Sequence, residues 1–151
     1  MSPAQVALLV VGILGLQVLI WIPVLMWIRR KSANMITDLT RELAVAGEHA
    51  VLGPVHGGYR GATAGAGFPF AKGNAIVALT HRRLVIRRLV GEPVEIPVAD
   101  ITAVREDQWF LRAYASGRLV AIIKTTSGAE VGLMVKNHDE WMAALRARIA
   151  A

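Results

Sequence analysis

The side chains of this sequence that could do chemistry match no known catalytic or metal-binding spacing. The four histidines, His49, His56, His81 and His138, are not arranged as in HExxH, the helical pattern that binds zinc. No GxSxG motif provides a serine nucleophile. The glycine-rich stretch lacks the GxxxxGKS or GxxxxGKT pattern that holds nucleotide phosphates. The absence of cysteine removes thiolate chemistry and fits a cytoplasmic location.

Four arginines on one predicted hairpin form the first candidate surface. They are Arg82, Arg83, Arg87 and Arg88. Each guanidinium near an anionic membrane contributes about 1 kcal/mol, so the group could bind lipid phosphates or a partner. The alternative is that strand alternation divides them between two faces. They would then be ordinary outward residues that pair with Glu92 or Glu95.

Aromatic residues provide two further candidates. Phe68 and Phe70 flank a proline at the tip of a predicted loop. They could enter lipid headgroups or cover the open end of a barrel. Trp109, Phe110 and Tyr114 precede a Ser-Gly turn, and either contact another protein or pack in the core.

The chain that carries these residues begins with an apolar segment. Residues 6–28 contain no charged side chain, and Arg29, Arg30 and Lys31 follow directly. At 1.5 Å per residue such a helix reaches about 30 Å, the thickness of a bilayer's hydrocarbon core. The expected membrane-embedded positions include Val6, Gly12, Gly15, Gln17, Trp21, Pro23, Trp27 and Ile28. We assign residues 1–31 to an anchor with a basic flank.

The charge distribution predicts the direction of the anchor. No Lys or Arg precedes the apolar segment, so the positive-inside rule places the N-terminus outside and the rest in the cytoplasm. The expected location is the cell (inner) membrane, crossed once. A cleaved signal peptide is disfavoured by the uncharged start, the long apolar run and the lack of a cleavage site. Gly12 and Gly15 are spaced GxxG rather than GxxxG, a weak dimerisation signal.

Residues 32–47 are predicted to form a helical stalk. Ile36, Leu39, Leu43 and Ala46 recur at spacings of 3, 4 and 3, and Gly47 provides a stop. The apolar stripe could be a short self-association seam. Packing against the following domain is favoured, because the stripe covers barely two heptads.

Residues 48–151 are predicted to form one domain, built mainly of β-strands. A first strand near 51–59 leads into a glycine-rich loop. Gly57, Gly61 and Gly65 have GxxxGxxxG spacing, but the segment contains Arg60 and is too short and polar to span a membrane. Short β-rich runs follow at 75–80, 84–89, 94–96, 101–109, 119–125 and 130–135, separated by turn signals. This spacing is typical of a sandwich or small barrel.

A single helix is predicted to end the chain. Asn137 with Glu140 fits a capping box, and Trp141, Leu145 and Ile149 form an apolar face. The domain carries 13 Lys and Arg against 9 Asp and Glu, a net charge of +4. No stripe of basic and aromatic residues indicates nucleic-acid binding.

Three segments carry a resemblance to a known family. Residues 73–86 and 95–104 resemble the strand motifs of GRAM and bacterial pleckstrin-homology-like domains, and residues 138–141 are similar to the start of their closing helix. The resemblance implies a small barrel of six or seven strands plugged by the C-terminal helix. It carries over no ligand site. It assigns Asp100 to a turn of the family, while Glu106 and Asp107 fit a solvated strand end better than a catalytic carboxylate pair.

Together these observations predict a mainly β protein with a transmembrane helix, a stalk and a helix-capped pleckstrin-homology-like barrel. We expect no catalysis, no cofactor and no metal. The expected function is protein interaction or scaffolding at the membrane, with a protein partner or a second copy of the chain. The alternative is a sensor of anionic lipid headgroups that uses the arginine hairpin and the Phe68 to Phe70 loop.

Overall fold

The computed structural model describes residues 2–63 and 67–150. Gly65, the last glycine of the GxxxGxxxG pattern, lies outside these residues. Contacts divide the chain into two compact units, one ending at Asn34 and the other beginning at Met35.

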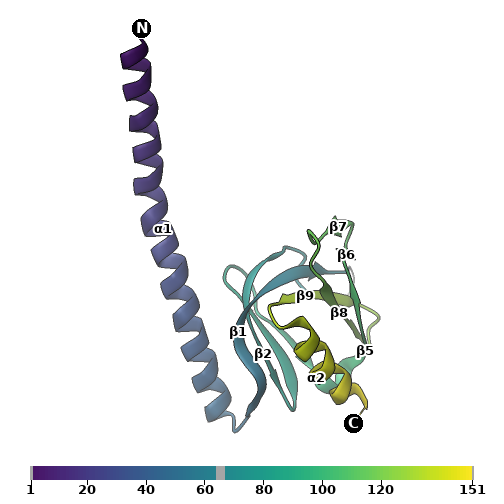
Figure 1. The fold of residues 1–151 in the computed structure, drawn as a ribbon. Coiled ribbons are helices and arrows are strands. Elements are labelled where there is room, and N and C mark those ends of the chain that lie inside the picture. The colour runs from purple at the N-terminus through teal and green to yellow at the C-terminus, as the bar shows by residue number, and fades with distance from the viewer. Residues whose placement is uncertain (1, 64–66, 151) are drawn as a thin grey trace. The chain divides into compact units, whose positions relative to one another are not determined.

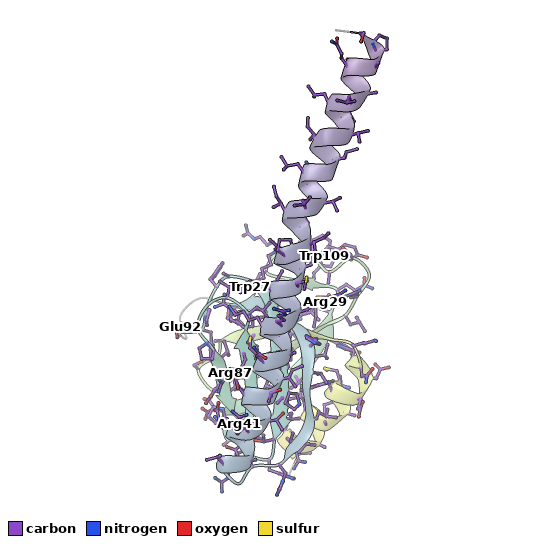
Figure 2. The ribbon with its side chains drawn as sticks, turned by 90° about the vertical axis from the view of Figure 1, so that its left-hand side faces the viewer. Trp27, Arg29, Arg41, Arg87, Glu92 and Trp109 are labelled. Atoms are coloured by element: carbon purple, nitrogen blue, oxygen red, sulfur yellow. The ribbon has the colours of Figure 1, made fainter. Side chains whose placement is uncertain are left out.

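The first unit consists of one helical segment. Helix α1 runs from Pro3 to Val45, so the predicted span and stalk belong to one uninterrupted helix. Its apolar window has a mean hydropathy of 2.6 and is fully exposed, and the helix is long and apolar enough to cross a membrane. Figure 2 shows Trp27 and Arg29 on this helix, and the Lys31 ammonium lies 4.8 Å from the centre of the Trp27 ring.

The second unit contains a curled, seven-stranded antiparallel sheet in the order β4-β3-β2-β1-β9-β8-β5 (Figure 1). Its strands are β1 Ala50–Ala62, β2 Gly73–Thr80, β3 Arg83–Arg88, β4 Val94–Pro97, β5 Ile101–Asp107, β8 Val120–Thr125 and β9 Glu130–Val135. The two edge strands, β4 and β5, are joined by the short helix η1, Val98–Asp100. The sheet therefore forms a half-barrel, which confirms the mainly β fold class.

Strand β1 is longer than the predicted 51–59 because it pairs on both sides. Its first part pairs with β2, and its later part pairs with β9 as well, with Tyr59 opposite Leu133. The pairing with β2 is irregular around Gly53, which has φ +78°. A Cβ at Gly53 would lie 2.4 Å from the Val77 carbonyl oxygen, so this close approach requires glycine.

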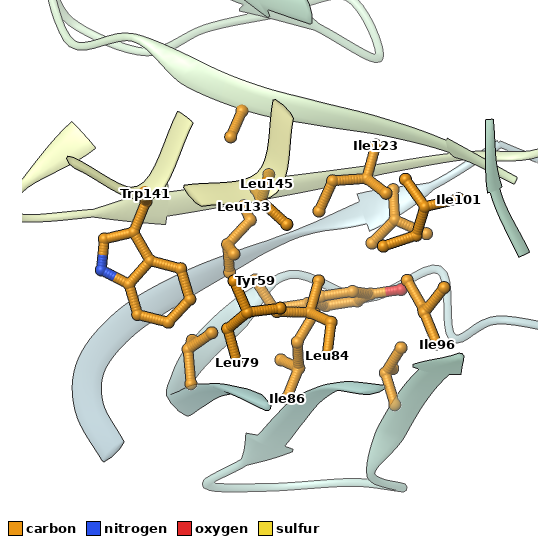
Figure 3. Close-up of a cluster of buried hydrophobic side chains, with 14 of the residues drawn as sticks. Tyr59, Leu79, Leu84, Ile86, Ile96, Ile101, Ile123, Leu133, Trp141 and Leu145 are labelled. Carbon is orange, nitrogen blue, oxygen red and sulfur yellow. The ribbon is translucent and has the colours of Figure 1, made fainter. Parts of the chain in front are cut away.

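The inner face of the sheet and helix α2, His138–Ala150, enclose the core (Figure 3). Inward positions alternate with outward ones along each strand, as the period of a pleated sheet requires. Trp141, Met142 and Leu145 of α2 are almost fully buried against the strands, and Ile149 is partly buried there. The terminal helix thus packs into the core through the apolar face that the sequence predicts.

The end of α1 covers part of the outer face of the sheet. Leu39 and Leu43 are buried against Ile76, Ala78 and Val85 on β2 and β3. The apolar stripe of the predicted stalk therefore packs on the domain, which is the alternative that the sequence favours.

A small hairpin follows β5, and the sequence analysis does not predict it. Residues 101–109 are predicted as one strand, but β5 ends at Asp107, and β6, Trp109–Phe110, pairs with β7, Ala113–Tyr114. The Asp107 carboxylate accepts a hydrogen bond from the Trp109 amide at 3.1 Å, and the chain turns there. The hairpin turn itself uses Leu111 and Arg112 at positive φ, so no glycine marks it.

Candidate functional site

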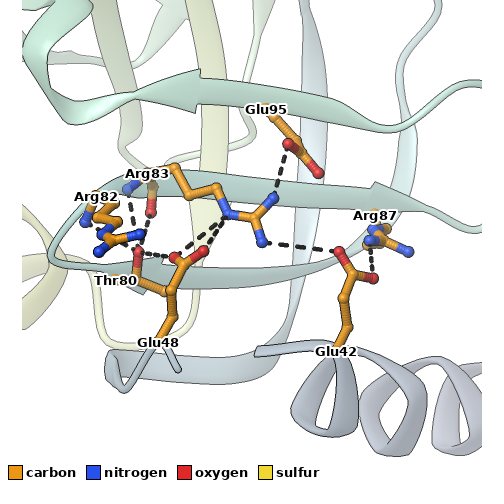
Figure 4. A network of polar contacts seen from close by, with 7 residues as sticks. All are labelled: Glu42, Glu48, Thr80, Arg82, Arg83, Arg87 and Glu95. Carbon is orange, nitrogen blue, oxygen red and sulfur yellow. Dashed lines mark hydrogen bonds and ion pairs between the residues drawn. The ribbon is translucent and has the colours of Figure 1, made fainter. Parts of the chain in front are cut away.

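Arg83 and Arg87 are held in ion pairs at the end of α1 (Figure 4). Arg83 donates hydrogen bonds to Glu48 Oε1 at 3.1 Å and to Glu95 Oε2 at 2.8 Å. Arg87 donates to the carboxylate of Glu42, the same group that lies 3.7 Å from Arg83 Nη2. The predicted pairing of this hairpin with Glu95 is present, and Glu92 forms no ion pair with the described residues.

Hydrogen bonds shift the pKa values of Glu48 and Arg83 in this network. The Thr80 hydroxyl donates to Glu48 Oε2 at 2.8 Å, and together with Arg83 it lowers the pKa of Glu48 although burial acts in the opposite sense. Burial disfavours the charged form of Arg83, but its bonds to Glu95 and Glu48 outweigh this and raise its pKa. The network therefore stays charged at neutral pH and ties the last turns of α1 to β3.

The other two arginines of the predicted surface form no ion pair with the described residues, although Arg82 lies beside Thr80 in Figure 4, where its backbone amide donates a hydrogen bond of 3.1 Å to the Thr80 hydroxyl oxygen. Arg88 donates to the Ala71 carbonyl oxygen at 3.0 Å, and its guanidinium lies 5.3 Å from the centre of the Tyr59 ring. Arg82 is exposed in the turn before β3. The structure thus places Arg83 and Arg87 together and separates them from Arg88, as strand alternation predicts.

The loop that contains Phe68 and Phe70 has one partly buried and one exposed ring. Phe68 packs against the core, and the Tyr59 hydroxyl donates a hydrogen bond of 2.6 Å to the Pro69 carbonyl oxygen. Burial raises the pKa of Tyr59, so the hydroxyl remains a donor. Phe70 is 68% exposed. Phe68 therefore helps to cover the barrel, while Phe70 is available for contact.

The β6–β7 hairpin exposes two aromatic rings in contact with each other. Trp109 is 57% exposed and Tyr114 is 48% exposed, and their ring centres are 5.2 Å apart. Phe110, between them in sequence, is instead buried over Gly132 on β9. The hairpin thus has a fixed base and an exposed aromatic pair, which we call the aromatic pair below.

A groove of about 1080 Å³ on the same unit is lined by residues from β1, β2, β9, the segment before β8 and the start of α2. Its walls carry Arg60, Lys72, Arg118 and Lys136. None of the four forms an ion pair or a side-chain hydrogen bond with any residue that the structure describes. We call this the basic groove. Sequence reasoning missed it because the four cations are distant in sequence and no local motif joins them.

One end of the basic groove contains a histidine paired with a carboxylate. His138 Nε2 lies 2.7 Å from Glu106 Oε2, and Asp139 is near both. A metal-bound imidazole usually donates its second N–H to an acceptor, but the buried Nδ1 of His138 has no partner among the described residues. His138 is therefore held by its contact with Glu106 and lacks, among the described residues, the acceptor at Nδ1 that a metal-bound imidazole usually has.

Comparison with known proteins supports the fold alone. The sequence matches no described protein family and no curated protein. Its structure is similar to the crystal structure of the C-terminal domain of an unknown protein from Leishmania infantum, with a TM-score of 0.54 and 15% sequence identity. The similarity covers 77% of this chain and 99% of that domain. The chain therefore shares a half-barrel architecture with a domain of unknown role.

Proposed function

We propose that this chain is a non-catalytic, single-pass membrane protein whose half-barrel binds a protein partner at the cytoplasmic face. The apolar part of α1 supports the anchor, and the basic flank at Arg29, Arg30 and Lys31 supports an N-out, C-in orientation. The antiparallel sheet packed against a C-terminal helix supports a pleckstrin-homology-like or GRAM-like fold.

The aromatic pair is the observation that carries this proposal. Aromatic residues are enriched at protein interfaces, and Trp and Tyr are prominent among the residues that dominate binding energy. Trp109 and Tyr114 lose little further conformational freedom on binding because their rings already contact each other. Phe110 holds the hairpin on β9, so the pair is presented on a rigid base.

Affinity purification of the full-length protein from its native membrane tests the proposal. We expect a stoichiometric companion, identified by mass spectrometry, that Trp109→Ala or Tyr114→Ala reduces about fivefold or more, as for interface residues worth more than about 1 kcal/mol. The matched control is Phe70→Ala, which removes an even more exposed ring elsewhere and should retain the companion. A protein recovered alone, or equal loss with Phe70→Ala, would contradict the proposal.

A second candidate function is contact with the lipid surface. It is favoured by the exposure of Phe70 and by the Arg88 hydrogen bond that fixes the neighbouring Ala71 beside β3. The chain has no cysteine, so Phe70→Cys gives a single site for a spin label. In vesicles with anionic lipid, lipid contact predicts that the label is relaxed more by oxygen than by a water-soluble nickel complex. A label at Val90→Cys, another exposed apolar position, is the control.

A further inference from the structure

We infer that the basic groove binds an extended acidic segment of the protein partner. This inference rests on the proposed protein-interaction function and specifies the chemistry of the partner. It would extend the binding surface from the aromatic pair to the neighbouring groove.

Charge is the first argument. Arg60, Lys72, Arg118 and Lys136 bring four formal positive charges to the groove, and Asp139 brings one negative charge. Elsewhere on this unit, Arg83, Arg87 and Arg105 are neutralised by glutamates. The groove cations have no such partners among the described residues, so an acidic ligand would supply the missing counter-charges.

The lining of the groove favours a polypeptide segment. Leu119 and Met134 add apolar surface to the lining that carries the cations, and Gly57 and Gly58 of β1 also line the groove. The volume of about 1080 Å³ is at the upper end of the range for small-molecule sites, and the groove is open. An extended chain with carboxylates and short aliphatic side chains matches this mixture better than a compact phosphate group.

The groove is also continuous with the aromatic hairpin. Gly117, Arg118 and Leu119 belong to the segment between β7 and β8 and line the groove. On the β9 side, a Cβ at Gly132 would meet both the Phe110 ring and the Cβ of Arg60, which shows that the base of the hairpin and a groove residue are adjacent. One partner can therefore cover both surfaces.

Fluorescence anisotropy with the full-length protein in phosphatidylcholine nanodiscs tests this inference. The probe is a labelled ten-residue peptide of alternating Glu and Ala, and its Gln counterpart is the neutral control. We expect the acidic peptide alone to bind, and the double variant Arg118→Gln with Lys136→Gln to weaken it about tenfold through loss of two charge contacts. The matched control, Arg146→Gln with Lys124→Gln, removes one exposed Arg and one exposed Lys outside the groove and should change nothing.

Three outcomes would overturn the inference. They are no binding of the acidic peptide, equal loss in both double variants, or tighter binding of soluble glycerophosphoinositol phosphate, which would assign the groove to a lipid headgroup. Co-purification of the companion protein distinguishes failure of the groove assignment from failure of the proposed function. If the groove double variant retains the companion while Trp109→Ala loses it, the protein-interaction function stands and the groove assignment fails. If no companion exists, the proposed function fails whatever the peptide does.

Discussion

At the scale of single residues, Glu48 determines how the polar network responds to acid. Its side chain is 9% exposed and accepts hydrogen bonds from Thr80 and Arg83. Because folding lowers its pKa, the bound carboxylate contributes stability that is fully present above the unfolded pKa, near 4.5. That contribution is lost as the pH falls through the folded pKa.

We predict that Glu48→Gln lowers the free energy of unfolding by about 1.5–3 kcal/mol at pH 7, the usual value of a hydrogen bond to a charged group. The difference from the unaltered protein should shrink as the pH falls from the unfolded pKa, near 4.5, through the lowered folded pKa, because Glu48 then becomes protonated and neutral like Gln. Chemical denaturation in detergent across this pH range measures it. Glu92→Gln, an exposed carboxylate without an ion pair among the described residues, is the control.

Gly132 controls the position of the aromatic hairpin. A Cβ there would lie 2.4 Å from Phe110 Cδ1, so we predict that Gly132→Ala displaces Phe110 from β9. Amide hydrogen exchange of residues 108–116 should then accelerate, while that of β2 and β3 stays unchanged. Gly73→Ala, where a Cβ meets nothing within 4 Å, should leave the exchange unaltered. Unchanged protection in Gly132→Ala would show that Phe110 does not anchor the hairpin.

At the scale of secondary-structure elements, the contact of α1 with the sheet rests on two leucines. Leu39 is fully buried among Ile76, Ala78 and Val85. We predict that Leu39→Ala lowers the free energy of unfolding by about 2–5 kcal/mol, the range for large-to-small core substitutions. Val45→Ala, at an 85% exposed position of the same helix, should change it by less than about 0.5 kcal/mol. Similar values for the two variants would mean that the helix does not pack on the sheet.

Elements with a strong period could be predicted from sequence, and those without one could not. The strands at β2, β3 and β9 and the face of α2 follow from alternating or helical apolar positions. The β6–β7 hairpin was missed because each strand has two residues and its turn uses Leu111 and Arg112 at positive φ. The far end of β1 was missed because its glycines suggest a loop, whereas pairing with β9 keeps it extended.

At the scale of the whole molecule, the basic groove depends on tertiary structure. Arg60 and Lys72 are separated by a loop, and Arg118 and Lys136 come from the other half of the sheet. Sequence reasoning instead selected Arg82, Arg83, Arg87 and Arg88 because they are close in sequence. Two of these are neutralised by Glu42, Glu48 and Glu95, of which the sequence predicts only Glu95, because the other two come near only in the folded chain.

The same partners predict where a stable fragment begins. A fragment of residues 35–151 retains Leu39, Leu43 and Glu42, whereas one of residues 48–151 loses all three. We predict that the longer fragment unfolds cooperatively and that the shorter one is markedly less stable and binds a hydrophobic dye, because Ile76 and Val85 become exposed. Thermal unfolding of the two fragments measures this. Equal midpoints would mean that residues 35–47 add nothing to the domain.

The double pairing of β1 has a consequence for biosynthesis. Strands β2, β3 and β4 are consecutive and can pair as soon as they are made. Tyr59 of β1, in contrast, can pair with Leu133 only after β9 has been synthesised. Until β9 leaves the ribosome, one side of β1 is an open edge. Chains that terminate early would keep that edge permanently, and two such chains could pair through it. We therefore expect truncated products to aggregate, because pairing with β9, the last strand, is the step that covers the open edge of β1.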